Sequence, residues 1–413
     1  MTVVEGVADL VARRALRAVF QPIVDLDSGH VVAYEALTRG PQGSPLERPD
    51  VLFEQARAQG LHVELDRACR DMALATAHAA GVRERRLFVN AEPDALGTLP
   101  SAAEHEALPV TLELTERELT SRPAEMLRAV ATARDRGWGI ALDDVGADPA
   151  SLALLPLISP DVIKLDLRLV QARPDPEVAA VMSALTAHAE RTGALLLAEG
   201  IETHAHVLVA RSLGATLGQG WHFGRPAPLP ADAALPSSSP LDLPFLGGDR
   251  MHERRTPFRA VTEHRAQRSG TKRLLLEICT HLESKAAAGG RSAIVLSTFQ
   301  HERNLTPATA ALYEHLARVS ALVGAFGVGV DDLSVAGVRG GTLAPGDPLA
   351  LEWDVVVLTP DYAAALVALD RLDADVADLD RRFDFVLTHD RELVVQAARG
   401  LVAHLSPRDP RAL

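Results

Sequence analysis

The sequence predicts an α/β protein in which a modified (β/α)8, TIM-like barrel with one antiparallel strand precedes a smaller α/β domain. First, short β-type runs alternate with longer helical segments rich in Ala, Leu and Arg between about Val19 and Arg225. Second, eight such runs occupy this length, which favours a closed barrel over an open sheet. Third, Leu26–His30 is too short for a crossover helix, so the first two strands are expected to pair antiparallel.

The elements of the barrel follow from these patterns in chain order. A short amphipathic helix is expected before the first strand, because charged residues interrupt the apolar ones there, unlike in a signal peptide. Helical patterns between the strands include Leu65–Ala80, Pro123–Arg136 and Pro176–Arg191. The expected strands are Val19–Asp25, Val31–Leu37, Arg86–Asn90, Val110–Leu114, Gly139–Asp143, Val162–Leu165, Leu195–Ala198 and Ala215–Gly218.

A change of composition after the barrel divides the chain into three parts. Residues 1–230 form the expected barrel with its N-terminal helix, and residues 231–255, rich in Pro, Ser and Gly, form a linker. Residues 256–407 again alternate strands and helices, which predicts an α/β domain of about 150 residues. Its expected helices are Lys272–Ala288, Pro307–Val319, Tyr362–Leu372 and Asp390–Leu405, and its expected strands are Ala293–Phe299, Ala321–Val330, Trp353–Thr359 and Arg382–Thr388.

Net charge and cysteine content restrict the possible functions. The net charge of −13 argues against DNA as a partner, because phosphate contacts need a basic surface. Cys69 and Cys279 match neither a disulfide framework nor a zinc spacing, which is typical of a reducing cytoplasm. No apolar stretch approaches the length of a membrane span. We therefore expect a cytoplasmic protein without a membrane segment.

Polar side chains stand at the ends of successive strands of the expected barrel. These strand ends meet at one face of a (β/α)8 barrel, where active sites are built from several strands at once. A single acid there would be an ordinary turn residue, but a consecutive series predicts a convergent site. The series consists of Glu35, Asn90, Glu113 with Glu116, Asp143–Asp144, Lys164 with Asp166, and Glu199, and the last strand leads to Gln219.

The chemistry of this series follows from its charge. Crowded carboxylates raise one another's pKa values, and hard divalent cations such as Mg²⁺ or Mn²⁺ relieve the repulsion. Adjacent acids suit two ions about 3.5–4 Å apart, an arrangement that cleaves phosphodiesters. Zinc is less favoured because no cysteine or histidine converges on the site. Lys164 is suited to orient or deprotonate the attacking water, or to neutralise developing charge. The alternative interpretation is a solvated rim of salt bridges.

The ordered motifs of residues 12–228 resemble those of the EAL domain, the bacterial cyclic-di-GMP phosphodiesterase family. The family motif itself is Glu35–Ala36–Leu37, which continues into Thr38–Arg39 and follows Gln21–Pro22–Ile23–Val24. Further matching motifs are Phe88–Val89–Asn90, Glu113–Leu114–Thr115–Glu116, Asp143–Asp144, Ile163–Lys164–Leu165–Asp166, Ala198–Glu199–Gly200–Ile201–Glu202, Gln219–Gly220–Trp221 and Phe223–Gly224–Arg225–Pro226.

The resemblance implies Mg²⁺- or Mn²⁺-dependent hydrolysis of cyclic-di-GMP to linear pGpG by a barrel with one antiparallel strand. It implies that Lys164 and Glu199 are catalytic, that Arg39 contacts a substrate phosphate and that Gln219 lies near the nucleophilic water. Glu116 matches the acid that anchors the loop after the paired aspartates, and Asp166 and Glu202 match supporting acids. By the same analogy a homodimer through the barrel is expected. The implied metal ligands are Glu35, Asn90, Glu113, Asp143, Asp144 and Glu199.

One departure from the family pattern concerns the loop after the paired aspartates. Where the family has Phe–Gly and a turn with glycine and tyrosine, this chain has Val145–Gly146–Ala147–Asp148–Pro149. Pro149 fixes its own φ and favours an extended Asp148, so this loop is expected to be stiffer. The departure leaves open an alternative function, a catalytically weak or inactive cyclic-di-GMP receptor that relays occupancy to a signalling partner protein.

After the linker, the chain has Phe299–Gln300 at the end of one expected strand and Trp353–Asp354–Val355–Val356–Val357 in another. In order and character this segment is similar to the DICT domain, a sensory module found beside cyclic-di-GMP signalling domains, and the similarity implies a regulatory role.

Two features of the barrel segment have simpler interpretations. Trp221 is interpreted either as stacking on a base or as packing at the barrel rim. Asp66–Arg67 is interpreted as surface pairing on a helix rather than as a ligand contact.

Overall fold

The computed structural model describes residues 6–92, 94–95, 108–146, 149–171, 175–230, 233, 241, 243, 255–331, 334–373 and 376–405. Most of the predicted linker, residues 231–255, lies outside these ranges, as do Ala147 and Asp148 of the loop after the paired aspartates. The chain forms two compact units. The first contains residues 1–116, 129–147 and 160–248, and the second contains residues 117–128, 148–159 and 249–413.

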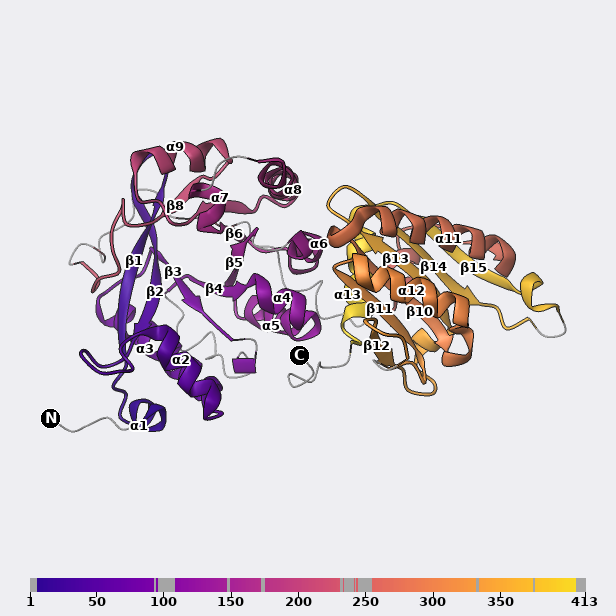
Figure 1. The fold of residues 1–413 in the computed structure, drawn as a ribbon, viewed down its shortest axis with the longest axis horizontal. Coiled ribbons are helices and arrows are strands. Elements are labelled where there is room, and N and C mark those ends of the chain that lie inside the picture. Colours follow the sequence, from indigo (N-terminus) through magenta and orange to yellow (C-terminus); the bar gives the residue numbers. More distant parts are fainter. Residues whose placement is uncertain are drawn as a thin grey trace. The chain divides into compact units, whose positions relative to one another are not determined.

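Eight strands form a closed barrel in the order β1 to β8 (Figure 1). Strand β1 pairs antiparallel with both β2 and β8, and the remaining neighbours are parallel, which confirms the predicted barrel with one antiparallel strand. The strands are β1 (Arg17–Asp25), β2 (Val31–Arg39), β3 (Arg86–Asn90), β4 (Val110–Thr115), β5 (Gly139–Val145), β6 (Val162–Leu165), β7 (Leu195–Ala198) and β8 (Leu217–Gln219).

The helices of this part of the chain precede the first strand or lie between the strands, and α8 and α9 begin with a capping side chain readable in the sequence. Helix α8 has Asp175 as its N-cap, whose side chain accepts from the Val178 amide, and ends at Gly193 in the left-handed conformation. The helices are α1 (Val7–Ala12), α2 (Pro49–Ala58), α3 (His62–Ala79), α4 (Glu116–Ser121), α5 (Pro123–Asp135), α6 (Pro149–Ile158), α7 (Leu167–Gln171), α8 (Pro176–Thr192) and α9 (His204–Ser212).

The barrel interior is apolar away from the carboxyl ends of its parallel strands. A buried cluster there includes Ile23, Phe88, Val162 and Leu197, which point inward from four different strands. Because these side chains fill the lower layers of the barrel, the polar residues at the strand ends lie over a packed base rather than over a water-filled channel.

The second unit contains a seven-stranded sheet in the order β12-β11-β10-β13-β14-β15-β9. Only β10–β11 and β11–β12 are parallel pairs. Its strands are β9 (Arg268–Thr271), β10 (Ile294–His301), β11 (Leu322–Val328), β12 (Arg339–Thr342), β13 (Glu352–Leu358), β14 (Ala363–Asp370) and β15 (Arg382–Thr388). Its helices are α10 (Pro257–Thr262), α11 (Lys272–Gly289), α12 (Pro307–Val319) and α13 (Arg391–Val402), with 3-10 turns at Gly290–Ser292, Glu302–Asn304, Pro348–Leu351 and Asp378–Asp380.

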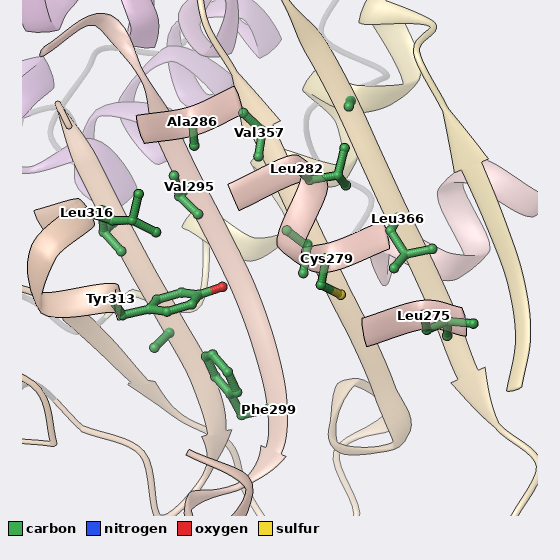
Figure 2. Packing of buried hydrophobic residues seen from close by; sticks show 14 of the residues in the cluster. Leu275, Cys279, Leu282, Ala286, Val295, Phe299, Tyr313, Leu316, Val357 and Leu366 are labelled. Atoms are coloured by element: carbon green, nitrogen blue, oxygen red, sulfur yellow. The ribbon is translucent and has the colours of Figure 1, made fainter. Parts of the chain in front are cut away.

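Helices α11 and α12 cover one face of this sheet and bury a continuous apolar core (Figure 2). Figure 2 shows Ala286 and Leu282 of α11 near Val357, and Tyr313 of α12 beside Phe299. The Tyr313 and Phe299 rings meet edge to face with centroids 5.2 Å apart. Helix α13 packs against β13 and β14. The core therefore explains why the apolar residues of α11 recur at helical spacing.

The helix predicted at Tyr362–Leu372 is wrong, because Ala363–Asp370 is strand β14. This strand lies between β13 and β15 and is buried along almost its whole length. Its alanines and leucines favour a helix by intrinsic propensity. Pairing on both edges and helices packed on the sheet override that propensity, as is usual for a central strand.

Among the described residues, none of the helices combines the length and the apolar character that crossing a bilayer requires.

Candidate active site

The strand ends bring the predicted polar residues together at one end of the barrel. Glu35 lies within β2, Asn90 ends β3, Glu113 lies in β4 and Lys164 lies in β6. Their neighbours in the chain are strongly buried, since they belong to the strands that close the barrel. The remaining members of the group are Asp143 and Asp144 of β5, Glu199 directly after β7, and Gln219 at the end of β8.

Lys164 lies at the centre of the group, with only 1% of its side chain exposed. Its Nζ is 2.7 Å from Glu113 Oε1, 2.9 Å from Asp143 Oδ1 and 2.9 Å from Glu199 Oε1. Glu35 Oε1 is farther away, at 3.8 Å. Burial alone would lower the pKa of Lys164, but these surrounding carboxylates raise it well above its usual value. The lysine is therefore held as an ammonium group.

Glu35 is oriented by two amide side chains. Gln219 Nε2 donates to Glu35 Oε2 over 2.5 Å, and Asn90 Nδ2 lies 3.4 Å from Glu35 Oε1. Gln219 Nε2 also lies 3.3 Å from Gln21 Oε1. The other amide atom, Gln219 Oε1, is buried and has no hydrogen-bond partner among the described residues. This carbonyl oxygen is thus available to accept a hydrogen bond from a bound molecule.

The paired aspartates owe their direction to a β-bulge in β5. The pairing of β5 with β6 shifts register between Leu142 and Val145, and Asp144 has a φ of +58°. This left-handed conformation is uncommon outside glycine but is tolerated by aspartate. The bulge allows one carboxylate oxygen each from Asp143, Asp144 and Glu199 to lie within 4.8 Å of one another.

The loop after the bulge is fixed by Glu116 and by a glycine. The Gly146 amide donates to Glu116 Oε2 over 2.8 Å. Gly146 has a φ of +106°, and a Cβ at this position would lie 2.5 Å from Leu169 Cδ1. Val145, which replaces the phenylalanine of the family pattern, is completely buried. The first two residues of the loop that differs from the family pattern are therefore held close against the barrel.

The carboxylates of this cluster carry more negative charge than the protein alone compensates. With five carboxylates and one ammonium group, the cluster has a formal net charge of −4. Burial and nearby acids raise the pKa of Glu113 well above its usual value and that of Glu199 to about 8. Both oxygens of Glu113 are buried, and the ion pair of Oε1 with Lys164 is the contact that offsets the charge of this carboxylate. This donor set fits hard divalent cations, which prefer oxygen ligands.

A cavity of about 270 Å³ opens beside the cluster. Trp221 lies at its edge with 55% of its surface exposed, and the Arg225 guanidinium lies 4.1 Å from the centre of the indole ring. The cavity has both a charged wall and an aromatic wall. Its lining consists of Gln21, Glu35, Leu167, Glu199, Gly200, Glu202, Gln219, Gly220 and Trp221.

Three predicted residues lie outside the central cluster. Arg39 ends β2, and its guanidinium donates to the Thr38 carbonyl over 2.7 Å. Asp166 accepts from the Arg168 amide and guanidinium, over 2.7 and 3.0 Å, at the start of α7. Glu202 lines the cavity but is exposed to solvent. We therefore expect these residues to act on a bound substrate or on the loops, not on the carboxylate cluster directly.

Gln21 is a cavity residue to which the sequence analysis gave no role. It lies in the middle of β1, and the search for strand ends does not include such positions. The antiparallel register of β1 on β2 pairs Gln21 with Glu35 and so carries its side chain to the site. The predicted antiparallel hairpin is the sequence signal from which Gln21 could have been found, because the register of a hairpin fixes which residues face each other.

Two family models match the chain. The EAL domain model matches residues 5–226, more than half of the chain. The model named "Sensory domain in DIguanylate Cyclases and Two-component system", or DICT, matches residues 259–371.

Similar curated proteins include two from Pseudomonas aeruginosa. The cyclic di-GMP phosphodiesterase NbdA is 32% identical over 231 residues, covering 51% of this chain and 29% of the relative. The cyclic di-GMP phosphodiesterase RocR is 31% identical over 235 residues, covering 51% of this chain and 57% of the relative. The chain thus spans only a part, at most 57%, of these two relatives.

Among solved structures, the Klebsiella pneumoniae BlrP1 complex with manganese and cy-diGMP has 28% sequence identity and a TM-score of 0.47. That alignment covers 52% of this chain and 56% of the other. The match of the family model to residues 5–226, together with the ordered motifs at the barrel's strand ends, identifies the chain as a member of the EAL domain family that also carries a DICT domain.

Proposed function

We propose that the barrel hydrolyses cyclic-di-GMP to linear pGpG with two Mg²⁺ or Mn²⁺ ions, and that the DICT domain regulates this activity. The observation that carries the proposal is the carboxylate cluster around Lys164, whose surplus of four negative charges matches the charge of two divalent cations. The names of the similar curated proteins support the choice of substrate.

The metal ions would be held by oxygen atoms from five strands. When bound, such ions lower the pKa of a coordinated water and stabilise charge on the phosphate. Because Asp143 and Asp144 are adjacent in the bulge, they are suited to lie between two cations. The proposed ligands are Glu35, Asn90, Glu113, Asp143, Asp144 and Glu199.

Lys164 is proposed to orient the attacking water and to offset negative charge as the phosphate reacts. Its Nζ already donates to three carboxylate oxygens, an arrangement that favours a donor role over that of a general base. Its side chain is already fixed by ion pairs to Glu113, Asp143 and Glu199, so little reorganisation is needed when the substrate binds.

The remaining residues would bind and position the substrate. Gln219 Oε1, which is buried and available, would accept a hydrogen bond from the water. Arg39 would contact a phosphate, for which a guanidinium fork is well suited. Glu116, Asp166 and Glu202 would support the loops around the site, and the Glu116–Gly146 hydrogen bond is one such contact.

Replacing Trp221 with alanine is expected to raise KM for cyclic-di-GMP about tenfold, because stacking on a base contributes about 1–3 kcal/mol. Replacement with phenylalanine should preserve most of the affinity, since it retains a ring at the edge of the cavity. Initial rates at increasing substrate concentration measure both values. An unchanged KM for Trp221→Ala would mean that the indole only packs at the barrel rim.

The proposed reaction is tested by incubating the purified chain with cyclic-di-GMP and either Mg²⁺ or Mn²⁺, and by separating the nucleotides chromatographically. We expect linear pGpG to accumulate, and we expect EDTA to stop the reaction. Binding of cyclic-di-GMP without any pGpG over hours would contradict the enzymatic function.

A second candidate function is a cyclic-di-GMP receptor that relays occupancy to a signalling partner. The observation in its favour is the altered loop, in which Val145 replaces phenylalanine and Asp148–Pro149 follows. The polar cluster itself does not distinguish the two functions, because it can bind metal and substrate in either case. The incubation described above does distinguish them, because a receptor retains the nucleotide unchanged.

A further inference from the structure

Helix α3 contains a buried ion pair between Asp66 and Arg70, one helical turn apart. Their side chains are 4% and 1% exposed. The predicted surface pairing on this helix is confirmed for Arg67, whose Nε lies 3.7 Å from Asp71 Oδ2, but is wrong for Asp66, which is buried. A buried ion pair is rarely more stabilising than an apolar pair of the same size, because both charges lose their hydration. Stability alone therefore does not explain the presence of this ion pair in α3.

Both partners of this pair also bind the chain directly after Asn90. Asp66 Oδ1 accepts from the Glu92 amide over 3.2 Å, and Arg70 Nη2 donates to the Ala95 carbonyl over 3.2 Å. The Ala95 amide in turn donates to the Glu92 carbonyl over 2.9 Å, which closes a turn. The ion pair thus fixes both ends of this turn, and the turn begins two residues after Asn90.

Asn90 connects this turn to the carboxylate cluster. Its side chain amide lies 3.4 Å from Glu35 Oε1, and its backbone precedes Ala91, whose amide donates to the Glu113 carbonyl. Ion pair, turn, Asn90 and Glu35 form one continuous series of contacts. Asn90 itself is exposed, so packing alone does not hold its side chain in place.

We propose that Asp66 and Arg70 are positioning residues, which hold Asn90 in the geometry that a divalent cation beside Glu35 requires. Groups that orient metal ligands without touching the metal commonly contribute 10- to 100-fold to metal affinity. The part of this inference that concerns catalysis rests on the proposed phosphodiesterase function. The part that concerns metal binding can be tested without a substrate.

The barrel offers a matched control in a second buried ion pair. Asp161 and Arg134 are both 2% exposed, and Asp161 Oδ2 accepts from the Ile140 amide over 2.7 Å. Asp161 directly precedes β6 and Ile140 is the second residue of β5, so this pair lies at the amino ends of the strands. It shares the burial and the backbone hydrogen bond of the first pair but lies at the opposite end from the carboxylate cluster.

The experiment compares Asp66→Asn, Arg70→Lys and Asp161→Asn in the full chain. Mn²⁺ binding is measured by calorimetry, thermal unfolding by circular dichroism, and pGpG formation at increasing Mn²⁺ concentration. We expect the unfolding midpoint to fall in Asp66→Asn and Asp161→Asn. Of these two aspartate variants, only Asp66→Asn should weaken Mn²⁺ binding, by about tenfold, and saturating Mn²⁺ should restore its activity. Arg70→Lys keeps the charge but not both contacts, and should weaken binding less.

Wild-type Mn²⁺ affinity in both Asp66→Asn and Arg70→Lys would overturn the proposal, as would equal weakening in Asp161→Asn. If Asp66→Asn does not fold, Arg70→Lys decides the question by the same calorimetric measurement. A wild-type chain that binds no Mn²⁺ would overturn both this proposal and the proposed function. Mn²⁺ binding by the wild-type chain without hydrolysis would overturn the proposed function alone.

Discussion

Replacing Glu113 with glutamine is expected to lower the rate of cyclic-di-GMP hydrolysis about a thousandfold or more, because the change removes a proposed metal ligand and its charge. The same change should raise the unfolding midpoint of the metal-free protein. Glu113 is buried beside the acids Glu35 and Asp143, and its ion pair with Lys164 offsets only part of that repulsion. Removing its charge relieves more repulsion than the single attraction to Lys164 that it loses.

This prediction is checked by steady-state rates with Mn²⁺ and by thermal unfolding in EDTA. Glu190→Gln on α8 is the control. Glu190 is exposed, and its replacement changes the net charge by the same amount at a position away from the site. The control should alter neither quantity. An active Glu113→Gln variant, or one with a lower midpoint in EDTA, would show that the cluster is not a repulsive metal site.

The second unit is expected to lose stability as pH rises from about 5 to about 8. Glu352 and Asp354 lie on the same face of β13, and the Phe258 amide at the start of α10 donates to Glu352 Oε2 over 3.0 Å. Burial raises the pKa of Glu352 to about 7, and Asp347 contributes to this effect. Burial and the neighbouring Glu352 raise the pKa of Asp354 well above its usual value.

The sign follows from proton uptake. A carboxyl whose folded pKa exceeds its unfolded pKa binds its proton more tightly in the folded state, so it stabilises at low pH. That contribution is lost as pH rises through the folded pKa. For Glu352, a shift from 4.5 to about 7 corresponds to about 3 kcal/mol. Thr298 donates to Asp354 and to the Glu352 carbonyl, but no described cation pairs with either acid to offset the effect.

Hydrogen exchange of residues 352–370, corrected for the intrinsic effect of pH, measures this local stability in the full chain. We expect protection to decrease with pH in the wild-type protein and to change much less in Glu352→Gln, which cannot ionise. Protection that increases with pH would contradict this prediction. So would the same dependence of protection on pH in the wild-type protein and in Glu352→Gln, because it would mean that the pair of Glu352 and Asp354 does not cause the loss of stability.

The sequence predicted the barrel and the members of its polar cluster well because both depend on local signals. The buried runs that precede Glu35, Glu113 and Asp143 are visible as short apolar segments followed by an acid. The antiparallel β1–β2 pair followed from the length of one connection. These features need no knowledge of distant contacts.

Features that depend on distant contacts were missed or wrongly assigned. The inward orientation of Asp66 is decided by the turn after Asn90, which lies more than twenty residues away in the chain. Strand β14 was assigned as a helix because its alanines favour one, whereas its two neighbouring strands decide its conformation. Gln21 was given no role because only the register with β2 reveals that it faces Glu35.

The reversed direction of β1 also determines where the chain enters the barrel. In a barrel whose strands are all parallel, the first strand begins at the end remote from the active site. Here Arg17, the first residue of β1, pairs with Arg39, the last residue of β2, so β1 begins at the end that carries the carboxylates. Helix α1, whose Val7 and Leu10 pack against α2 and α3, therefore leads the polypeptide to the end of the barrel that carries the carboxylates. A mechanical or conformational signal that arrived through residues preceding β1 would reach Gln21 along a single strand.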